Sequence, residues 1–440
     1  MSDYMFTLES HLSADQFRVV GQMRALAGAT GASLYLTGGA IRDMLAGFPV
    51  RDLDFTVEGN ALKLAKTAAQ KCQAAMVSVD DVRKSAELRF PGGVTAEVTM
   101  ARSERYTKSG GRPQISPATI HEDLRGRDFT INAVALSLNR ASLGLPIDPT
   151  NGVGDIERKE IRAIHNYSFY DDPSRILRMF RFKARLGFAI DERPRLQYEN
   201  ARGADMLARV SPEALGVELH HMANEPLAHD LMKALEDEKL LDLFSPALQG
   251  SKLNLAEFGK LQKSRQMAPF DYRLHSLPLF LIVLMEKLNA KEAAEFAKAT
   301  ALTRAEMNAV TKLAAAAKKL DRELKSPKLQ KPSHIYAAIS KAPGEQVLYL
   351  AVYSTQRLVH DRIRNYFQKH LPMAMEVTNE MVAATGATPG TPKFHKAKEE
   401  LVLKHLDARP KKVAPPPEAP PPPPTSAFAR GPGVRPARVP

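Results

Sequence analysis

The chain has 440 residues, 44% of them hydrophobic, which is enough apolar surface to bury substantial cores and to divide into more than one module. Its 62 Lys and Arg residues against 49 Asp and Glu give a formal net charge of +13, an excess that favours attraction to a polyanion. No apolar run is long enough to cross a bilayer and the N-terminus lacks a secretion signal, so we expect a cytoplasmic protein. The single cysteine, Cys72, excludes an intrachain disulfide and a cysteine-rich zinc site.

The first informative segment combines a glycine turn with a short helix. Residues 33–37 predict a strand, Gly38 and Gly39 a turn, and residues 40–46 a helix. Glycines let the backbone approach a ligand closely, and N–H groups at a helix start suit phosphate. Arg42 on this helix would be a charge-assisted donor to a triphosphate, although pairing with neighbouring charges would also explain it.

Asp52 and Asp54 follow, one residue apart, in a strand-like segment. Alternation along a strand places both carboxylates on one face and buries Leu53 and Phe55 on the other. Hard cations such as Mg2+ bind carboxylate oxygens together with substrate phosphates. An isolated pair of this kind is more often a half-exposed strand, but the preceding glycine turn favours a divalent-metal site that takes a nucleoside triphosphate.

Glu97 is the candidate third carboxylate. A turn at residues 91–93 would reverse the chain between strands 86–90 and 94–101. Alternation then puts Glu97 on the polar face with Thr99. A solvent-facing strand residue explains Glu97 equally well.

Two further pairs have helical spacing. Asp128 and Asn132, four apart in a predicted helix, would share one face, although a cap and a surface amide also explain them. Asp172 and Arg175 place a carboxylate beside a guanidinium, which together match the amine and ring nitrogen of cytosine or adenine and reject uracil and guanine. The residues alone favour a structural alternative, in which Asp172 caps a helix whose first residue is Pro173.

The helix predicted over residues 173–186, with Gly187 as its end, also carries a basic stripe. Arg178, Arg181 and Arg185 recur at helical spacing. Such a stripe usually means a solvated helix face, but the net charge of the chain favours contact with RNA phosphates.

These segments, in this order, resemble the class II nucleotidyltransferases, which comprise the tRNA CCA-adding enzymes, their CC-adding and A-adding relatives, and bacterial poly(A) polymerases. The resemblance covers residues 30–190, and an ordered set of motifs is more specific than any one motif. Two departures are Gly126 before Arg127, where the family has paired arginines, and Asn151 in place of a glycine. The matching segments are GGAIRDMLAGFPVRDLDFTV (38–57), AEVTMAR (96–102), RDFTINA (127–133), Asp148-Pro149 with Gly152 and Asp155, and DDPSRILR (171–178).

The resemblance implies an α+β fold: a small nucleotidyltransferase head with a mixed sheet and helices, followed by an all-helical body. From about residue 193 the pattern is helical, and the proline-rich end cannot pack a core. We expect the basic tail to be disordered, with weak RNA affinity, a proline-binding partner or no role. The predicted divisions are a catalytic head (1–160), a base-recognition neck (161–230), an RNA-binding body (231–407) and a disordered tail (408–440).

The resemblance also implies residue roles. A primer 3′-hydroxyl attacks the α-phosphorus of a nucleotide and expels pyrophosphate, with two Mg2+ ions stabilising the entering and leaving oxygens. The implied assignments are Asp52, Asp54 and Glu97 as catalytic residues, the first two as metal ligands; Gly38, Gly39, Arg42, Arg127, Asp128, Asn132, Asp172, Arg175 and Arg178 at the nucleotide, Asp128 and Asn132 at its ribose; and Arg181 and Arg185 at RNA.

We therefore expect transfer of CMP, AMP or both from CTP or ATP to the 3′ end of tRNA or another RNA. A poly(A) polymerase would share every head motif. A different class of function is also possible: an RNA-binding protein whose transferase head has lost its catalytic activity. The presence of all three carboxylates argues against this alternative. The sequence does not distinguish CCA, CC and A addition, and it leaves the oligomeric state open.

Overall fold

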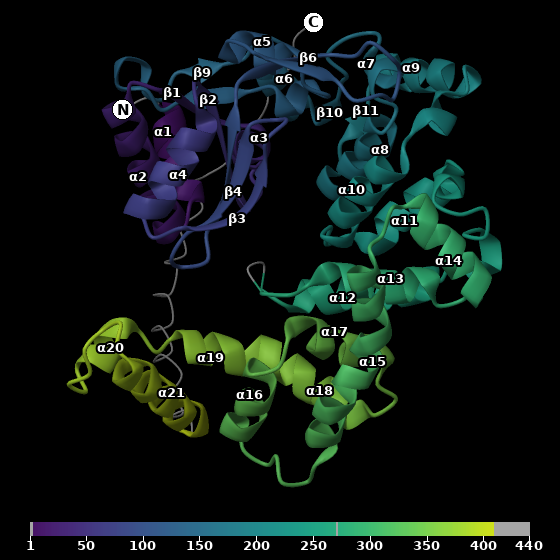
Figure 1. Ribbon diagram of the computed structural model, residues 1–440. Helices are drawn as coiled ribbons and strands as arrows, with labels where there is room; N and C mark the ends of the chain where they lie inside the picture. The colour runs from purple at the N-terminus through teal and green to yellow at the C-terminus, as the bar shows by residue number, and fades with distance from the viewer. Residues whose placement is uncertain (1–2, 270–271, 409–440) are drawn as a thin grey trace, which may run out of the picture.

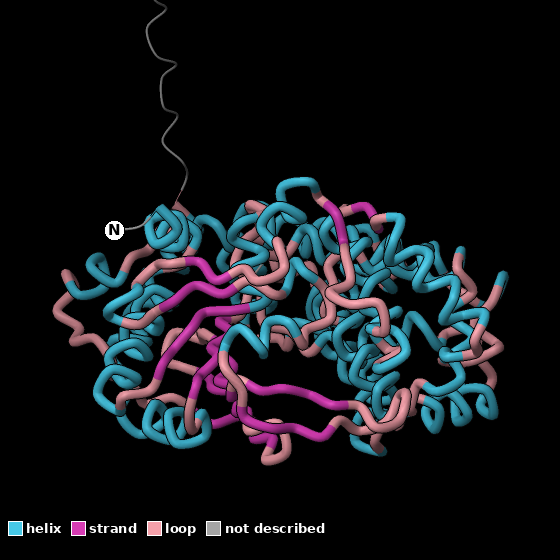
Figure 2. Tube along the Cα trace, turned by 90° about the horizontal axis from the view of Figure 1, so that it is seen from above, coloured by secondary structure: helices cyan, strands magenta, loops and turns pink. Residues whose placement is uncertain are grey.

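The computed structural model describes residues 3–269 and 272–408. The chain forms a curved succession of modules, from an N-terminal head through a helical neck into a helical body, whose last helices turn back below the head (Figure 1). Seen from above, strands are concentrated in the head and at its border with the neck (Figure 2). The predicted α+β architecture is confirmed. The tail expected from residue 408 lies, from residue 409 on, outside the described residues.

The head is built on one mixed seven-stranded sheet of order β3-β4-β5-β2-β1-β8-β9. The pairing of β2 with β5 is parallel and the other pairings within this sheet are antiparallel. The apolar residues of the central strands pack with four helices, α1 to α4, in a core of the head. The elements are α1 (Asp3–His11), α2 (Ala14–Thr30), β1 (Ser33–Thr37), α3 (Gly38–Leu45), β2 (Leu53–Glu58), α4 (Ala61–Lys71), β3 (Ala75–Asp80), β4 (Ser85–Arg89), β5 (Thr95–Met100), β8 (Ala135–Ser137) and β9 (Pro146–Ile147).

Between β5 and the neck the chain forms short elements that carry the other candidate residues. The prediction of a helix around Asp128 and Asn132 is wrong, because Phe129 is extended and Thr130–Asn132 form a single 3-10 turn. The surrounding elements are the hairpin β6 (Arg102–Arg105) and β7 (Gln114–Pro117), α5 (Ile120–Arg125), α6 (Gly152–Arg158), β10 (Glu160–Ile161), α7 (Ser168–Asp171), α8 (Arg175–Leu186) and β11 (Ala189–Ile190).

Helix α8 begins at Arg175, two residues later than predicted, and ends at Gly187, whose φ of 67° is left-handed. Ile176, Leu177 and Phe180 form its buried apolar face. The helices that follow are α9 (Glu192–Gly203), α10 (Pro212–Ala223), α11 (Ala228–Asp237), α12 (Leu255–Met267), α13 (Ser276–Met285), α14 (Ala290–Ala299), α15 (Arg304–Lys325), α16 (Pro332–Ser340), α17 (Gly344–Tyr353), α18 (Arg357–Asn365), α19 (Leu371–Met375), α20 (Asn379–Ala383) and α21 (Pro392–Asp407).

Neck and body share one hydrophobic core, which runs from Phe129 to Phe367. The division predicted at residue 230 therefore does not separate two cores. A smaller core begins at Ala374 and ends at Leu406. In the part of the chain that the structure describes, no helix combines the length and apolar character needed to span a bilayer.

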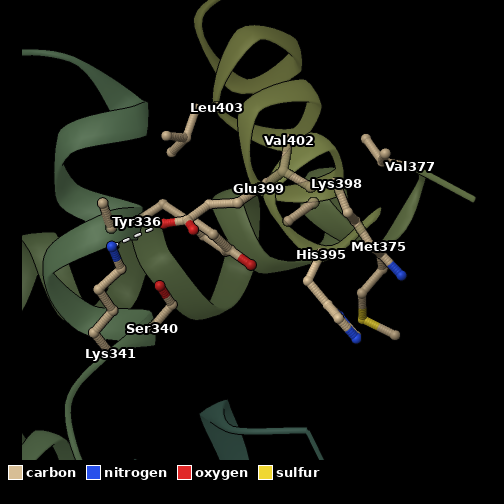
Figure 3. Close-up of a pocket in the computed structure, with 12 residues that line it drawn as sticks. Tyr336, Ser340, Lys341, Met375, Val377, His395, Lys398, Glu399, Val402 and Leu403 are labelled. Atoms are coloured by element: carbon tan, nitrogen blue, oxygen red, sulfur yellow. Dashed lines mark ion pairs between the residues drawn. The ribbon is translucent and has the colours of Figure 1, made fainter. Parts of the chain in front are cut away.

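The C-terminal helices border a groove of about 580 Å3, lined by residues of α16 and α21 and of the segment from α19 (Figure 3). An ion pair of 2.8 Å between Lys341 and Glu399 lies across it. None of the predicted site residues lines this groove. The predicted site residues lie instead at the head sheet and the neck.

The short turn at Thr130 depends on Gly152 at the start of α6. A Cβ at residue 152 would lie 2.1 Å from the Thr130 carbonyl oxygen, which is backbone and cannot swing away. Asp155 then accepts a 2.6 Å hydrogen bond from the Thr130 hydroxyl. The segment after the sheet thus fixes the turn that carries Asp128 and Asn132.

We predict that Gly152→Ala lowers the free energy of unfolding by about 1–3 kcal/mol, because the backbone must shift to admit the methyl group. Gly28→Ala is the matched control, since a Cβ at this exposed position of α2 would meet no atom within 4 Å. That change should add about 0.5–1 kcal/mol through helix propensity. Denaturant unfolding measures both, and equal stabilities of the two variants would contradict the role given to Gly152.

Candidate active site

The structure places the three predicted carboxylates together beside the glycine turn. Asp54 of β2 is in direct register with Glu97 of β5, and Asp52 lies immediately before β2. Leu53 and Phe55 are fully buried, as the alternation predicts. The Gly39 N–H donates a 3.0 Å hydrogen bond to Asp54 Oδ2 and so ties the turn to the carboxylates.

The charges of this group are mutually unfavourable. Burial, together with the negative charges of Glu97 and Asp52, raises the pKa of Asp54 to about 7, against the opposing effect of Arg127 and Arg42. A set of carboxylate oxygens whose repulsion is unrelieved suits a hard divalent cation.

The carboxylates do not form a preformed metal-binding site. Within residues 3–269 and 272–408, no group of three or more acidic, histidine or cysteine side chains is already disposed around one ion. Asp52 instead accepts a hydrogen bond from the Thr95 hydroxyl, and Glu97 accepts one of 3.1 Å from the Thr99 hydroxyl. These side chains would have to turn towards an ion to bind it.

The glycine turn packs tightly against neighbouring side chains. Gly38 has a φ of 61°, and a Cβ there would lie 3.1 Å from Arg127 Nη1. A Cβ on Gly39 would lie 3.1 Å from Asp54 Oδ2. This close packing places the backbone of the glycine turn directly beside the Asp54 carboxylate.

Arg42 does not point to solvent. It is 3% exposed, and its guanidinium donates two hydrogen bonds to Asp43 and one of 2.7 Å to Asn132 Oδ1. Of the two interpretations of Arg42, the structure shows pairing with neighbours. Its contact with a triphosphate stays a prediction.

Arg127 connects the carboxylates with the following turn. Its Nη2 donates to Asp123 Oδ2 at 2.8 Å, and its Nη1 donates to the Asn132 carbonyl oxygen at 3.1 Å. The same guanidinium reaches the hydroxyls of Thr37 and Thr56 on the central strands. The arginine thus lies between the sheet and the predicted ribose residues.

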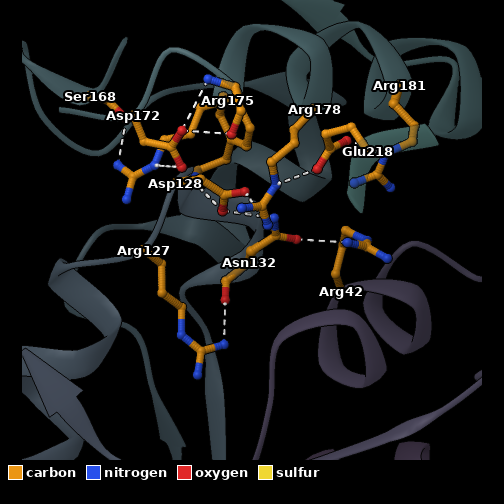
Figure 4. A network of polar contacts seen from close by, with 12 residues as sticks. Arg42, Arg127, Asp128, Asn132, Ser168, Asp172, Arg175, Arg178, Arg181 and Glu218 are labelled. Atoms are coloured by element: carbon orange, nitrogen blue, oxygen red, sulfur yellow. Dashed lines mark hydrogen bonds and ion pairs between the residues drawn. The ribbon is translucent and has the colours of Figure 1, made fainter. Parts of the chain in front are cut away.

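Asp128 and Asn132 meet by direct contact, without a helix. Asp128 Oδ1 accepts hydrogen bonds from the Phe129 N–H at 2.7 Å and from Asn132 Nδ2 at 3.0 Å (Figure 4). Its Oδ2 lies 2.9 Å from Arg178 Nη2. Burial would raise the pKa of Asp128, but Arg178 and the Asn132 hydrogen bond outweigh it and hold the pKa below its usual value. The carboxylate is therefore ionised.

Asp172 and Arg175 also lie side by side, with 3.9 Å between Oδ2 and Nε. Asp172 Oδ1 accepts from the Ser174 N–H at 3.0 Å and from its hydroxyl at 2.6 Å, which fixes the turn before α8. The N-cap of α8 is Ser174. The prediction that Asp172 is the N-cap is therefore wrong, because Asp172 lies two residues before it. Its second oxygen remains beside Arg175, where the predicted base reading would need it.

Arg181 and Arg185 of the arginine stripe on α8 face inward, and this corrects their predicted exposure. Arg181 is 5% exposed and pairs with Glu218 at 3.1 Å and Glu225 at 3.2 Å. Arg185 pairs with Asp43 of the head and lies 4.0 Å from Glu225. Because a buried guanidinium needs anionic partners, these arginines are internal ion pairs, and the structure contradicts an open surface for RNA phosphates at Arg181 and Arg185.

Glu218 and Glu225 were not among the predicted residues, although Glu218 left a signal in the sequence. It lies on the same stripe of α10 as the buried residues Leu215, Leu219 and Met222. An acidic residue within an apolar stripe indicates a buried partner.

The hairpin β6–β7 is another feature that the sequence did not place. Glu104 accepts from Arg102 Nε at 2.8 Å and from the Tyr106 hydroxyl at 3.1 Å. Near its tip, the Gly110 N–H donates to the Asp171 carbonyl oxygen at 3.1 Å. The hairpin thus rests on the segment that leads into Asp172.

Comparison with known proteins finds a family model that matches the head and solved structures that match most of the chain. Residues 34–162 match the family model described as the poly(A) polymerase head domain. An A-adding tRNA nucleotidyltransferase of Aquifex aeolicus is 31% identical over 265 residues, covering 60% of this chain and 32% of that protein. A CC-adding tRNA nucleotidyltransferase of Deinococcus radiodurans is 38% identical over 153 residues, covering 35% and 41%. The chain therefore spans less than half of the length of these two curated relatives.

The similarity to solved structures extends along nearly the whole chain. The apo form II of a CCA-adding enzyme superposes with a TM-score of 0.56 at 25% identity, covering 94% of this chain and 96% of that one. The head and the helical modules after it thus share the fold of that enzyme.

We predict that Asp54→Asn raises the melting temperature at pH 8 without divalent ions, because it removes a buried charge repelled by Asp52 and Glu97. The folded-state pKa of about 7 is above the ordinary value of 3.8, so folding stability falls as pH rises between these values. The gain should therefore shrink at pH 5, and Mg2+ should stabilise the parent chain more than the variant.

Thermal unfolding at both pH values, with and without Mg2+, measures these effects. Asp81→Asn is the control, since Asp81 is an exposed carboxylate outside the cluster. A melting temperature of Asp54→Asn that is lower at both pH values would refute the repulsion.

Proposed function

We propose that this chain, whose residues 34–162 belong to the family of poly(A) polymerase head domains, transfers CMP or AMP from CTP or ATP to the 3′ end of tRNA. The observation that carries the proposal is the adjacency of Asp54 and Glu97 beside the Gly39 N–H. The similarity over 94% of the chain to a CCA-adding enzyme supports tRNA as the acceptor. A cytoplasmic location is part of the same proposal.

The carboxylates supply the chemistry at the reacting phosphorus. Asp52 and Asp54 would hold Mg2+, with Glu97 beside them, and the bound metal supplies charge stabilisation for the entering and leaving oxygens. Gly38 and Gly39 would let the backbone come close to the triphosphate, whose position at the start of α3 is favoured by the positive end of the helix dipole.

The remaining residues would orient the nucleotide. Asp128 Oδ2 and Asn132 would hold the ribose hydroxyls. Asp172 would accept a hydrogen bond from the exocyclic amine of cytosine or adenine, while Arg175 donates to the ring nitrogen beside it. Arg175 is held for this role by a 2.9 Å hydrogen bond to the Ser168 hydroxyl.

Poly(A) synthesis is the second candidate, and the description of the matched head family favours it. Sequencing of products from tRNAs that end before CCA, after C and after CC distinguishes the two. We expect addition that stops at the CCA end, whereas long A tracts on all three substrates would establish a polymerase. Absence of any incorporation would point to a decayed transferase head.

We predict that Asp172→Ala reduces discrimination against UTP and GTP more than it slows incorporation of CTP or ATP. Losing a hydrogen bond to a charged partner costs about 1.5–3 kcal/mol, or about a tenfold to hundredfold change in selectivity. Single-nucleotide incorporation rates with all four nucleotides measure this. Ser174→Ala is the control, because it keeps the carboxylate and removes one hydrogen bond of the turn. An unchanged ratio with a lowered melting temperature would leave Asp172 a purely structural role.

A further inference from the structure

The head and neck meet in a closed ring of ion pairs and hydrogen bonds, part of which is visible in Figure 4. Each member contacts the next, and the ring crosses from one module to the other twice, between Asp128 and Arg178 and between Arg185 and Asp43. In order, its members are Arg42, Asn132, Asp128, Arg178, Glu218, Arg181, Glu225, Arg185 and Asp43, which contacts Arg42 again.

Within this ring the two oxygens of Asp128 differ. Oδ1 already accepts two hydrogen bonds, from the Phe129 N–H and from Asn132. Oδ2 is buried and accepts no hydrogen bond, although it forms an ion pair with Arg178. A carboxylate oxygen has about two acceptor sites, so Oδ2 keeps one for a further donor.

Whether that site stays open depends on Arg178. Its Nη2 is 2.9 Å from Asp128, while its Nε is 3.7 Å from Glu218 Oε1 on the opposite side. The guanidinium thus lies between two carboxylates, and its Nε is attracted to Glu218 by charge without a hydrogen bond. Without the second carboxylate, the planar fork of an arginine closes onto a single carboxylate with two parallel hydrogen bonds.

Glu218 is itself fixed in place. It is 3% exposed, and its Oε2 accepts from Arg181 Nε at 3.1 Å. Arg181 is in turn paired with Glu225. The position of the Glu218 carboxylate is therefore set by the neck and not by the nucleotide.

We propose that Glu218 is a positioning residue for ribose recognition: by holding Arg178 it keeps one acceptor site of Asp128 Oδ2 open for a ribose hydroxyl. The inference rests on the proposed nucleotidyl transfer and extends it to a residue outside every motif of the resemblance. Glu218 acts through Arg178 and does not itself touch the nucleotide.

The test compares ribonucleotides with deoxyribonucleotides. In Glu218→Gln, Arg178 closes on Asp128 and the acceptor site is lost, so the ratio of kcat/KM for ATP over dATP should fall about tenfold, the loss of one hydrogen bond to a charged group. Removing a negative charge also strengthens attraction of the triphosphate. That effect is common to ATP and dATP and cancels in the ratio.

Matched variants separate positioning from stability. Leu219→Ala, on the same helix and 1% exposed, destabilises the neck without touching the ring and should leave the ratio unchanged. Glu213→Gln, an exposed acid of α10, controls for helix charge. If Glu218→Gln does not fold, Glu218→Asp is the second variant. Its side chain is one methylene shorter and keeps the charge farther from Arg178, so the same ratio should fall by less.

A double-mutant cycle identifies the route. In an Arg178→Met background, Glu218→Gln should change the ATP to dATP ratio no further, because the residue through which it acts is absent. An unchanged ratio in the single variant, or a fall that persists without Arg178, would overturn the inference. No incorporation by the parent chain would instead refute the proposed function, so the two failures are distinct.

Discussion

Pairing of buried guanidinium groups is the constraint on which the arrangement of head and neck depends. Arg175 and Arg181 of α8 are 4% and 5% exposed, and Arg185 is largely covered. An unpaired charge in such a position is strongly destabilising, so each arginine requires a carboxylate or an oxygen acceptor. Some partners belong to the neck, as Glu218 does, and others to the head, as Asp43 and Asp128 do. Pairing the buried arginines of α8 therefore fixes the position of the head relative to the neck.

The carboxylates beside the glycine turn show the opposite balance. Where α8 has its charges neutralised, Asp54 keeps a pKa of about 7 because burial and the neighbouring acids disfavour its ionised form. Stability alone does not explain such a cluster, whereas binding of cations and phosphates does. The fold thus keeps its uncompensated charge on one face of the central strands β2 and β5 and its compensated charges at the interface.

Local pattern predicted the parts of the site that are local. The alternation around Asp54, the turn before Glu97 and the end of α8 at Gly187 follow from spacing within a few residues. The helix expected at Asp128 fails because the Thr130 carbonyl packs against Gly152, a contact across more than twenty residues of chain. The stripe of Arg181 was misassigned for a similar reason, since its partners lie 37 and 44 residues further on. Sequence periodicity records which face of a helix is charged, but not what that face meets.

The ring also connects with the body. Arg265 of α12 donates to the Ala223 carbonyl oxygen at 2.8 Å and to the Ser276 hydroxyl at 3.2 Å, next to Glu225. Burial and the positive charge of Arg51, the residue before Asp52, lower the pKa of Arg265, while Glu225 opposes them. Glu225 thus lies between a body helix and the strand that carries the catalytic candidates. Because neck and body share one core, a displacement of the body would reach the head through this carboxylate rather than through apolar contacts alone.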